Sequence, residues 1–414
     1  SLQKLMLKYF ICLIIVLNVS CSTNQSENAL NEIIGSMGAE FPKIISNPEK
    51  YHLQILYTQI DRNQKNQPTF KTFSFGVDTS RYFYPASSIK LPIAVLALEK
   101  ARIINEIDIY DKFQILPGPV YKNGIDKDIS SATGHPSLAH SIRNLFIISD
   151  NSANNYLYDF LGRDHINKRL WDLNLNSTRV RHRLSINLSD EENRFTHSIN
   201  FYNKLKIIYK QESQKGSLPL TSNVRDFNIG KYHYSNGEKK KGPLNFSTKN
   251  YMNLEDQHEL LKRLIFPKIY TKEKQFNLNN SDYEFLYREM SILPRQSDYP
   301  SFPDYDKHYD GYCKFFLYGD TKDKIPDNIK IFNKVGLAYG FVIDNAYIID
   351  ITKSVEFLLT AVIYSNPNQT MNDDDYDYEK ISIPFLANLG RKIYDLELKR
   401  SKKVLPDFQP FKNF

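Results

Sequence analysis

The sequence FYPASSIKLPIAVLAL, residues 83–98, places Ser87 three residues before Lys90 and follows the pair with an apolar run. In a helix that begins at Ser87, residues i and i+3 share one face, so the Lys90 amine lies beside the Ser87 hydroxyl. The apolar run predicts a helix buried inside a domain. A lysine in such a place loses solvation, which favours its neutral form and lets it act as a base. The alternative is structural: a helix-capping serine and a lysine whose ammonium reaches solvent.

Two further segments favour the chemical interpretation. Ser149-Asp150-Asn151 lies downstream of the pair, and Lys334-Val335-Gly336 lies near the C-terminus, before two strand-like runs. S-x-x-K, S-D-N and K-T-G, in this order, are the signature of class A β-lactamases and penicillin-binding proteins. The first two motifs are intact and the third is altered at its middle residue. The chain therefore resembles this family, and most closely its class A β-lactamase-like branch, over roughly residues 30–400.

The resemblance implies a catalytic role for four residues. Ser87 attacks a carbonyl carbon to form an acyl-enzyme, and Lys90 takes its proton, directly or through water. Ser149 relays a proton to the leaving nitrogen. The backbone N–H groups of Ser87 and Leu337 stabilise the oxyanion.

Substrate binding falls to three other motif residues. Asn151 holds a substrate amide with its carboxamide. Lys334, with Gly336 in the same motif, supplies positive charge to a substrate carboxylate. Asp150, between Ser149 and Asn151, is interpreted as structural, a carboxylate that fixes the loop by accepting backbone N–H bonds.

Two departures from the family pattern bear on the activity. Val335 replaces the hydroxyl residue of K-T-G, and loss of its charge-assisted hydrogen bond, worth about 1.5–3 kcal/mol, weakens docking of a β-lactam carboxylate. In the loop that carries the deacylating glutamate of class A enzymes, Arg183 occupies the glutamate place. The acidic residues that follow, Asp190, Glu191 and Glu192, are candidate substitutes for this base, or else form a polar helix start.

The order of the predicted elements indicates an α+β fold. Strand-like runs at 53–60 and 73–77 precede the serine helix, and strands return at 329–335, 340–343, 346–351 and 357–364, with a turn at Asp344-Asn345. A helix with Phe385, Leu389 and Ile393 on one side ends the chain. Strands, then helices, then strands predict one mixed lobe made from both ends of the chain, with a helical lobe inserted between them. The family resemblance implies that this mixed lobe is an antiparallel sheet flanked by terminal helices.

The domain limits follow from this order. Residues 47–105 and 328–414 form the mixed α/β lobe, and residues 106–327 form the helical lobe with insertions.

Residues 1–20 are predicted to be a signal peptide with a short basic start and an apolar centre. Residues 21–46 are a tether and first helix, with Cys21 as a lipidation site; ordinary secretion is the alternative. A lipid on Cys21 makes the protein a membrane-anchored periplasmic or outer-membrane lipoprotein.

Composition limits the remaining classes of function. The formal net charge of +7 is a mild excess for 414 residues and does not indicate nucleic-acid binding. The sequence shows no metal-ligand spacing and no phosphate-binding loop, so neither a metal nor a cofactor is expected. The prediction is a cell-envelope serine hydrolase acting on a small or peptidoglycan-derived carbonyl substrate, with inefficient β-lactam hydrolysis. A peptidase or esterase, and a binding protein that has lost turnover, are the alternatives.

Overall fold

The computed structural model describes residues 24–412 and 414. The predicted signal peptide and the predicted lipidation site, Cys21, lie outside these residues. No helix in the described part of the chain is long and apolar enough to cross a membrane.

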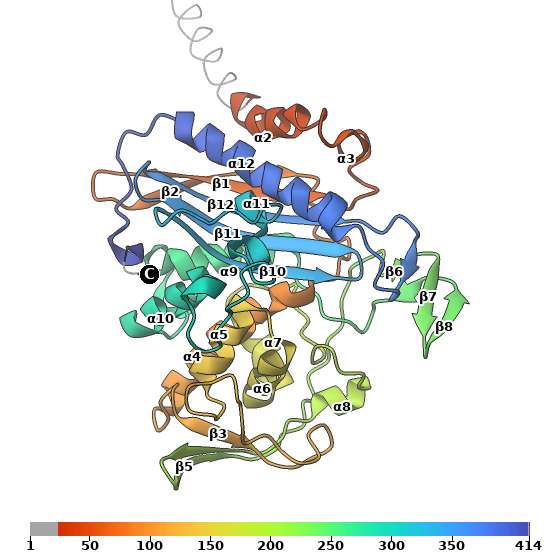
Figure 1. Ribbon diagram of the computed structural model, residues 1–414, viewed down its shortest axis with the longest axis vertical. Helices are drawn as coiled ribbons and strands as arrows, with labels where there is room; N and C mark the ends of the chain where they lie inside the picture. The colour runs from red at the N-terminus through yellow and green to blue at the C-terminus, as the bar shows by residue number, and fades with distance from the viewer. Residues whose placement is uncertain (1–23, 413) are drawn as a thin grey trace, which may run out of the picture.

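A five-stranded antiparallel sheet combines the two ends of the chain in the order β10-β11-β12-β1-β2 (Figure 1). Its strands are β1 (Gln54–Arg62), β2 (Pro68–Phe75), β10 (Ile329–Ala338), β11 (Phe341–Asp350) and β12 (Val355–Tyr364). Every residue of β11 and β12 is buried, because both faces of the sheet are covered. Strand β10 lies at an edge, so one side of its backbone is not paired within the sheet.

Helices from both ends of the chain cover one face of the sheet (Figure 1). They are α2 (Asn24–Ser36) and α12 (Ile383–Lys399), with the short α3 (Pro42–Ser46) and α11 (Phe315–Tyr318) beside them. Phe385, Leu389 and Ile393 of α12 are fully buried, at the spacing that the sequence predicts. The α+β fold with terminal helices on an antiparallel sheet is therefore confirmed.

The opposite face packs on the part of the chain between β2 and β10. Its helices are α4 (Lys90–Ile104), α5 (Leu138–Ile147), α6 (Asn151–Leu161), α7 (Arg163–Asp172), α8 (Asp190–Arg194), α9 (Leu254–Ile265) and α10 (Asn280–Ser291). Helix α4 is buried over most of its length, as its apolar sequence predicts.

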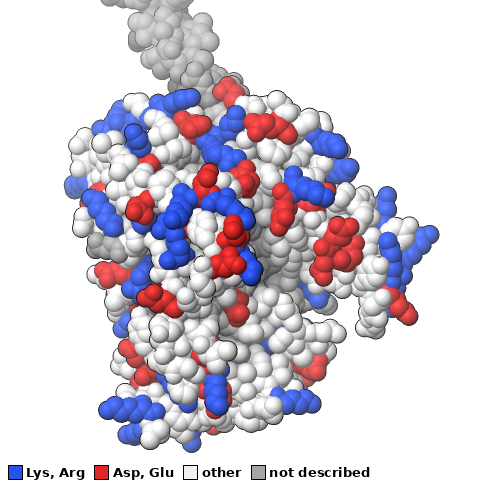
Figure 2. All heavy atoms as spheres, in the orientation of Figure 1, with Lys and Arg blue, Asp and Glu red and all other residues white. Residues whose placement is uncertain are grey.

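The chain also contains strands outside the main sheet that the sequence did not predict. A small sheet joins β3 (Lys112–Ile115), β4 (Ile199–Asn203) and β5 (Lys206–Gln211). A projecting hairpin of β7 (Tyr232–Ser235) and β8 (Glu238–Lys241) pairs with β13 (Thr370–Met371), and β6 (Asn228–Ile229) pairs with β9 (Leu244–Asn245). Strand β8 is exposed at every residue, so it lacks the alternating apolar pattern that identifies strands. Figure 2 shows the lysine-rich hairpin standing out from the body of the molecule.

The predicted turn at Asp344-Asn345 is wrong. Both residues lie in the middle of β11, and the chain turns at Tyr339-Gly340 instead. Buried hydrogen bonds compensate for their polarity: Asp344 accepts from the Phe315 and Phe316 N–H groups, and Asn345 donates to Gln257 O. Partners distant in sequence thus override the local turn preference of Asp and Asn.

Candidate active site

Ser87 lies in a 3₁₀ turn, Ala86–Ile89, that leads directly into α4. The Lys90 N–H donates to Ser87 O, and in a 3₁₀ turn side chains three residues apart lie on the same side. Ser87 is half-buried and Lys90 is 0% exposed. The preceding residue, Ala86, has a φ of 49°, a left-handed conformation that costs a non-glycine residue about 1–3 kcal/mol. The regular helix therefore starts three residues later than predicted, and the intervening turn presents Ser87.

The Lys90 amine lies at the centre of a polar cluster. Its Nζ is 2.5 Å from Ser149 O, 2.6 Å from Asn151 Oδ1 and 3.2 Å from Ser149 Oγ. Among the described residues, no hydrogen bond joins Lys90 Nζ to Ser87 Oγ. The S-x-x-K and S-D-N motifs are thus joined by hydrogen bonds of Lys90, and not by a hydrogen bond between Lys90 and Ser87.

Ser149 lies between two lysine amines. Lys334 Nζ donates to Ser149 Oγ at 2.9 Å and to Val335 O at 2.9 Å. Ser149 has a φ of 57°, so a second strained residue belongs to this cluster. The next residue, Asp150, caps α6 by accepting the Ala153 N–H at 2.6 Å, which leaves it the structural role expected from the sequence.

Strand β10 passes close to the Ser87 turn at Gly336. A Cβ atom on Gly336 would lie 2.6 Å from Pro85 O, 2.8 Å from Ser88 N and 3.1 Å from Ser87 N. Only glycine permits this approach. Leu337 follows on the strand and is 39% exposed. The edge of β10 therefore runs beside the Ser87 N–H, an arrangement that suits two backbone donors to one oxyanion.

Burial sets the charge of the two lysines. It lowers the pKa of Lys90 well below its usual range, and the neighbouring positive charge of Lys334 lowers this pKa further. Burial also lowers the pKa of Lys334, to about 8. A neutral Lys90 has two N–H donors and one lone pair. The two short contacts, to Ser149 O and Asn151 Oδ1, occupy the donors and leave the lone pair free to accept a proton.

Val335 lies on the other face of the sheet from this cluster. Its side chain is 4% exposed and packs in the apolar core between the sheet and the terminal helices. Side chains alternate along a strand, so Val335 points away from the face on which Lys334 lies. A hydroxyl at this position would not meet a substrate beside Lys334. The expectation that Val335 weakens carboxylate docking is therefore wrong.

Arg183, in the place of the family's glutamate, is buried inside the protein. Its guanidinium binds Asp159 at 2.7 and 3.2 Å, donates to Phe195 O at 2.7 Å and lies over the Tyr158 ring. Both members of the ion pair are 0% exposed in their side chains. Arg183 thus holds the loop to the body of the helical lobe.

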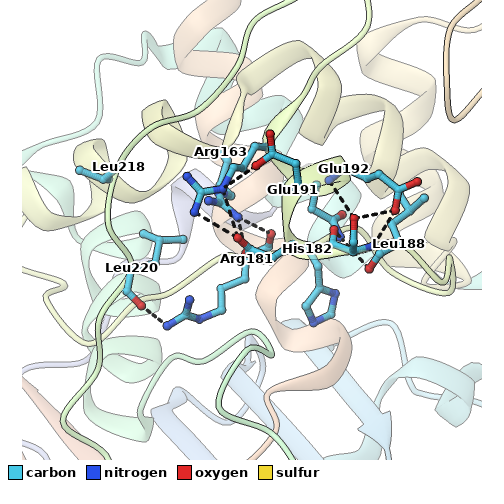
Figure 3. Close-up of polar contacts among 12 residues, drawn as sticks. Arg163, Arg181, His182, Leu188, Glu191, Glu192, Leu218 and Leu220 are labelled. Atoms are coloured by element: carbon cyan, nitrogen blue, oxygen red, sulfur yellow. Dashed lines mark hydrogen bonds and ion pairs between the residues drawn. The ribbon is translucent and has the colours of Figure 1, made fainter. Parts of the chain in front are cut away.

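The acidic residues proposed as substitute bases are not part of the Lys90 cluster. Asp190 pairs with Arg163 at 2.8 Å, and Glu191 pairs with Lys215 at 2.5 Å. Glu192 forms a capping box at the start of α8. Figure 3 shows Arg163, Glu191 and Glu192 around α8. The structure therefore favours the alternative interpretation, a polar helix start, for all three carboxylates.

One residue of the cluster escaped the sequence analysis. Asn151 Nδ2 donates to Ser185 Oγ at 2.7 Å, so the carboxamide bridges Lys90 and Ser185. Ser185 is exposed and has a φ of 55°. A single loop serine has no distinguishing pattern, and only its place two residues after Arg183 could have drawn attention to it.

No group of three or more His, Cys, Asp or Glu side chains that could hold a metal ion occurs among residues 24–412 and 414. The cluster itself consists of hydroxyl, amine and carboxamide groups, which suit acyl transfer.

Beta-lactamases are among the solved structures to which this chain is similar. The chain is similar to a beta lactamase from Xanthomonas campestris pv. campestris, with 13% identity, a TM-score of 0.47, and coverage of 90% of this chain and 98% of that one. It is similar to a beta-lactamase from Sphaerobacter thermophilus with 12% identity, a TM-score of 0.48, and coverage of 91% and 98%. No curated protein matches it. Likeness at this level says nothing of the substrate.

The family assignment comes from the sequence. Residues 40–279 match the model of the beta-lactamase enzyme family. This range contains Ser87, Lys90, Ser149 and Asn151, and it ends before Lys334. Because the match extends over more than half of the chain, the protein belongs to the beta-lactamase enzyme family.

Proposed function

We propose that this serine hydrolase of the beta-lactamase kind acts through an acyl-enzyme on Ser87, in the manner of class A. The observation that supports the proposal most is the buried Lys90 amine, whose donors are occupied by Ser149 O and Asn151 Oδ1. A binding protein has no need of a desolvated lysine beside a half-buried serine on a strained turn.

Acylation uses the groups of the cluster in turn. The lone pair of neutral Lys90 takes the Ser87 proton, directly or through a water molecule, as Ser87 Oγ attacks the carbonyl carbon. The backbone N–H groups of Ser87 and Leu337 receive the developing oxyanion. Ser149 Oγ, which accepts from Lys334, donates its own proton to the leaving nitrogen. Lys90 then reprotonates Ser149 through the 3.2 Å contact between Nζ and Oγ.

Two side chains would select the substrate. Lys334, buried and positively charged at neutral pH, attracts a substrate carboxylate. Gly336, in the same motif, allows the substrate to lie along the edge of β10. Asn151 has one N–H left after its bond to Ser185, and this N–H would hold a substrate amide. A small carbonyl compound with a carboxylate and an amide, of β-lactam or peptidoglycan type, satisfies these groups.

Hydrolysis of β-lactams is expected to be inefficient. Among the described residues, no Asp or Glu carboxylate is hydrogen bonded to Lys90, Ser149, Asn151 or Lys334. A slow second step suits a peptidase or esterase that acts on another envelope substrate equally well. A non-catalytic binding protein is the third candidate, and it predicts no adduct at all.

Intact-protein mass spectrometry tests the proposal. Incubation with a fluorophosphonate and, separately, with benzylpenicillin should add one covalent group to the unaltered protein. Ser87→Ala should show neither adduct while keeping its melting temperature within a few degrees, since the change removes one hydroxyl. An adduct of equal yield on Ser87→Ala would place the nucleophile elsewhere, and no adduct on the unaltered protein would favour the binding protein.

We further propose that the protein is exported and anchored through a lipid on Cys21. The support is the signal-like sequence before Cys21 and the polar sequence after it. Two or three acyl chains anchor a protein stably, whereas one binds only marginally. Cys21→Ser should move the protein from the membrane fraction to the soluble fraction. Full retention of this variant with membranes would contradict the lipid anchor.

A further inference from the structure

A cavity lies apart from the catalytic cluster, where the chain just before β1 and the end of β12 meet the segment around β6. Its volume of about 520 Å³ is within the range of cavities that bind small molecules. Ser87, Lys90 and Lys334, all of which the structure describes, are not among the residues that line it. The proposed acyl-enzyme therefore gives this cavity no role.

Backbone hydrogen bonds fix the segments that form the walls of the cavity. Tyr364 N, at the end of β12, donates to Tyr51 O at 2.7 Å. Arg225 N donates to Ser80 O at 2.8 Å, and this bond holds the chain before β6 beside Arg81. The cavity is thus formed by the fold itself and does not depend on a ligand to create it.

Arg81, in one wall, has N–H donors that the protein does not use. Its Nη1 donates to Glu49 O at 3.3 Å, and its Nη2 donates to His52 Nε2 at 3.1 Å. The buried Nε has no hydrogen-bond partner among the described residues, and Asp226 Oδ2 is 3.7 Å from it. A guanidinium binds a carboxylate through two parallel N–H bonds. Arg81 therefore retains the donors that recognition of a carboxylate requires.

The charge of the cavity also favours an anion. Lys50 and Arg81 line it, and Asp226 is the one carboxylate among the described lining residues. Asp226 also pairs with Arg225, so its charge is shared between two guanidinium groups. The Lys50 side chain is exposed and free to turn toward a ligand. The walls thus carry a net positive charge that attracts an anion.

His52 and Asn366 add an unused donor and an unused acceptor. Because Arg81 can only donate, His52 Nε2 accepts from it, and the proton of the neutral ring is on Nδ1. Burial, with the Arg81 charge, lowers the pKa of His52 to about 3, so the ring stays neutral. Asn366 is 6% exposed and donates to Thr370 O at 3.0 Å. Neither His52 Nδ1 nor Asn366 Oδ1 has a hydrogen-bond partner among the described residues.

Apolar side chains complete the walls. Tyr51, Ile229 and Tyr364 are buried and line the cavity beside these polar groups. We propose that the cavity binds a small organic carboxylate that also carries an amide and an apolar ring. The carboxylate lies on Arg81 and Lys50, the amide uses His52 and Asn366, and the ring packs on the apolar side chains.

Calorimetric titration with N-acetyl-L-phenylalanine tests the proposal, because this compound has a carboxylate, an amide and an apolar ring. N-Acetyl-L-phenylalaninamide is the matched neutral compound. The acid should bind the unaltered protein at millimolar concentrations, and the amide should bind at least about tenfold more weakly, the effect of one hydrogen bond to a charged group. Equal affinity for the two compounds, or no binding of the acid, would overturn the proposal.

Two variants locate the binding site. Arg81→Gln removes the guanidinium and should weaken binding of the acid by about tenfold or more. Lys50→Glu reverses an exposed charge at the cavity and should also weaken it, so the test does not depend on the stability of Arg81→Gln. Lys65→Glu makes the same change in the turn between β1 and β2 and should leave the affinity unaltered.

The catalytic lysine supplies the remaining control, since Lys334 could also attract a carboxylate. Lys334→Gln should bind N-acetyl-L-phenylalanine as the unaltered protein does. Loss of binding in Lys334→Gln, together with full binding in Arg81→Gln and Lys50→Glu, would place the ligand in the catalytic cluster and overturn the proposal. None of these measurements requires an acyl-enzyme, so failure of the proposed function would leave this test intact.

Discussion

Gly336→Ala tests whether the contact between β10 and the Ser87 turn builds the catalytic site. The added Cβ would lie 2.6 Å from Pro85 O, an oxygen that already accepts hydrogen bonds from Ser88 N at 3.1 Å and Ser88 Oγ at 2.6 Å. Ordinary contacts of a Cβ atom begin near 3.4 Å. All three close neighbours are backbone atoms, so no side chain can rotate away, and the strand and the turn must move apart.

The magnitude follows from two costs. Overpacking a well-packed contact typically destabilises a protein by about 1–3 kcal/mol. The larger effect should fall on the reaction, because the movement separates the N–H groups of Ser87 and Leu337. Loss of one oxyanion donor lowers a rate by about 10²–10³-fold. We therefore expect a modest fall in melting temperature and a fall of about two orders of magnitude in the acylation rate.

Both quantities can be measured on one preparation. Calorimetry gives the melting temperature, and intact mass at timed intervals gives the rate of fluorophosphonate labelling. Gly35→Ala is the control: Gly35 lies in α2 with nothing within 4 Å of an added Cβ, and alanine there should stabilise the helix by at most about 1 kcal/mol. Labelling of Gly336→Ala within threefold of the unaltered rate would refute the oxyanion assignment.

Three further predictions concern charge and burial. Val335→Thr should leave penicillin acylation unimproved and cost about 1–2 kcal/mol of unfolding free energy in urea, because it buries a hydroxyl in an apolar core; a tenfold gain in acylation would show that the side chain does reach the substrate. Lys334→Gln removes a positive charge that lowers the pKa of Lys90, so this pKa should rise and the acid limb of fluorophosphonate labelling should move to higher pH; an unmoved limb would contradict the coupling. Asp159→Asn leaves the charge of Arg183 buried without a partner and should cost about 3–5 kcal/mol of unfolding free energy; a loss below 1 kcal/mol would mean that the pair is not buried in solution.

Patterns confined to one element predicted the fold well. The apolar run after Lys90 identified the buried helix α4, and the spacing of Phe385, Leu389 and Ile393 identified α12. Such patterns report burial directly, because the period of the apolar residues matches the period of the element. The prediction of a turn at Asp344-Asn345 was wrong because hydrogen bonds from distant segments satisfy these two polar side chains inside a buried strand. The sequence around the two residues alone does not reveal those partners.

In the polar cluster, too, residues in sequence motifs could be predicted, whereas features that depend on distant packing could not. The motifs named Lys90, Ser149 and Asn151, and the structure places all three within hydrogen-bonding distance. Alternation along β10 places Val335 opposite Lys334, but the sequence could not show that the terminal helices pack against the Val335 face. Nor could it distinguish Ser185 from other loop serines.

The loop around Arg183 explains how a substitution at a catalytic place can leave the rest of the site intact. A carboxylate near Lys90 would stabilise its ammonium form, whereas Arg183 turns inward and neutralises Asp159, so no charge of either sign is added to the cluster. Lys90 consequently remains under the influence of burial and of Lys334, both of which favour the neutral amine that acylation needs. In the described part of the chain, the same arrangement leaves no carboxylate hydrogen bonded to the cluster to serve as a base in the hydrolytic step. The proposed acylation and the slow hydrolysis predicted for it would therefore share one physical origin, the absence of a hydrogen-bonded carboxylate from this cluster in the described part of the chain.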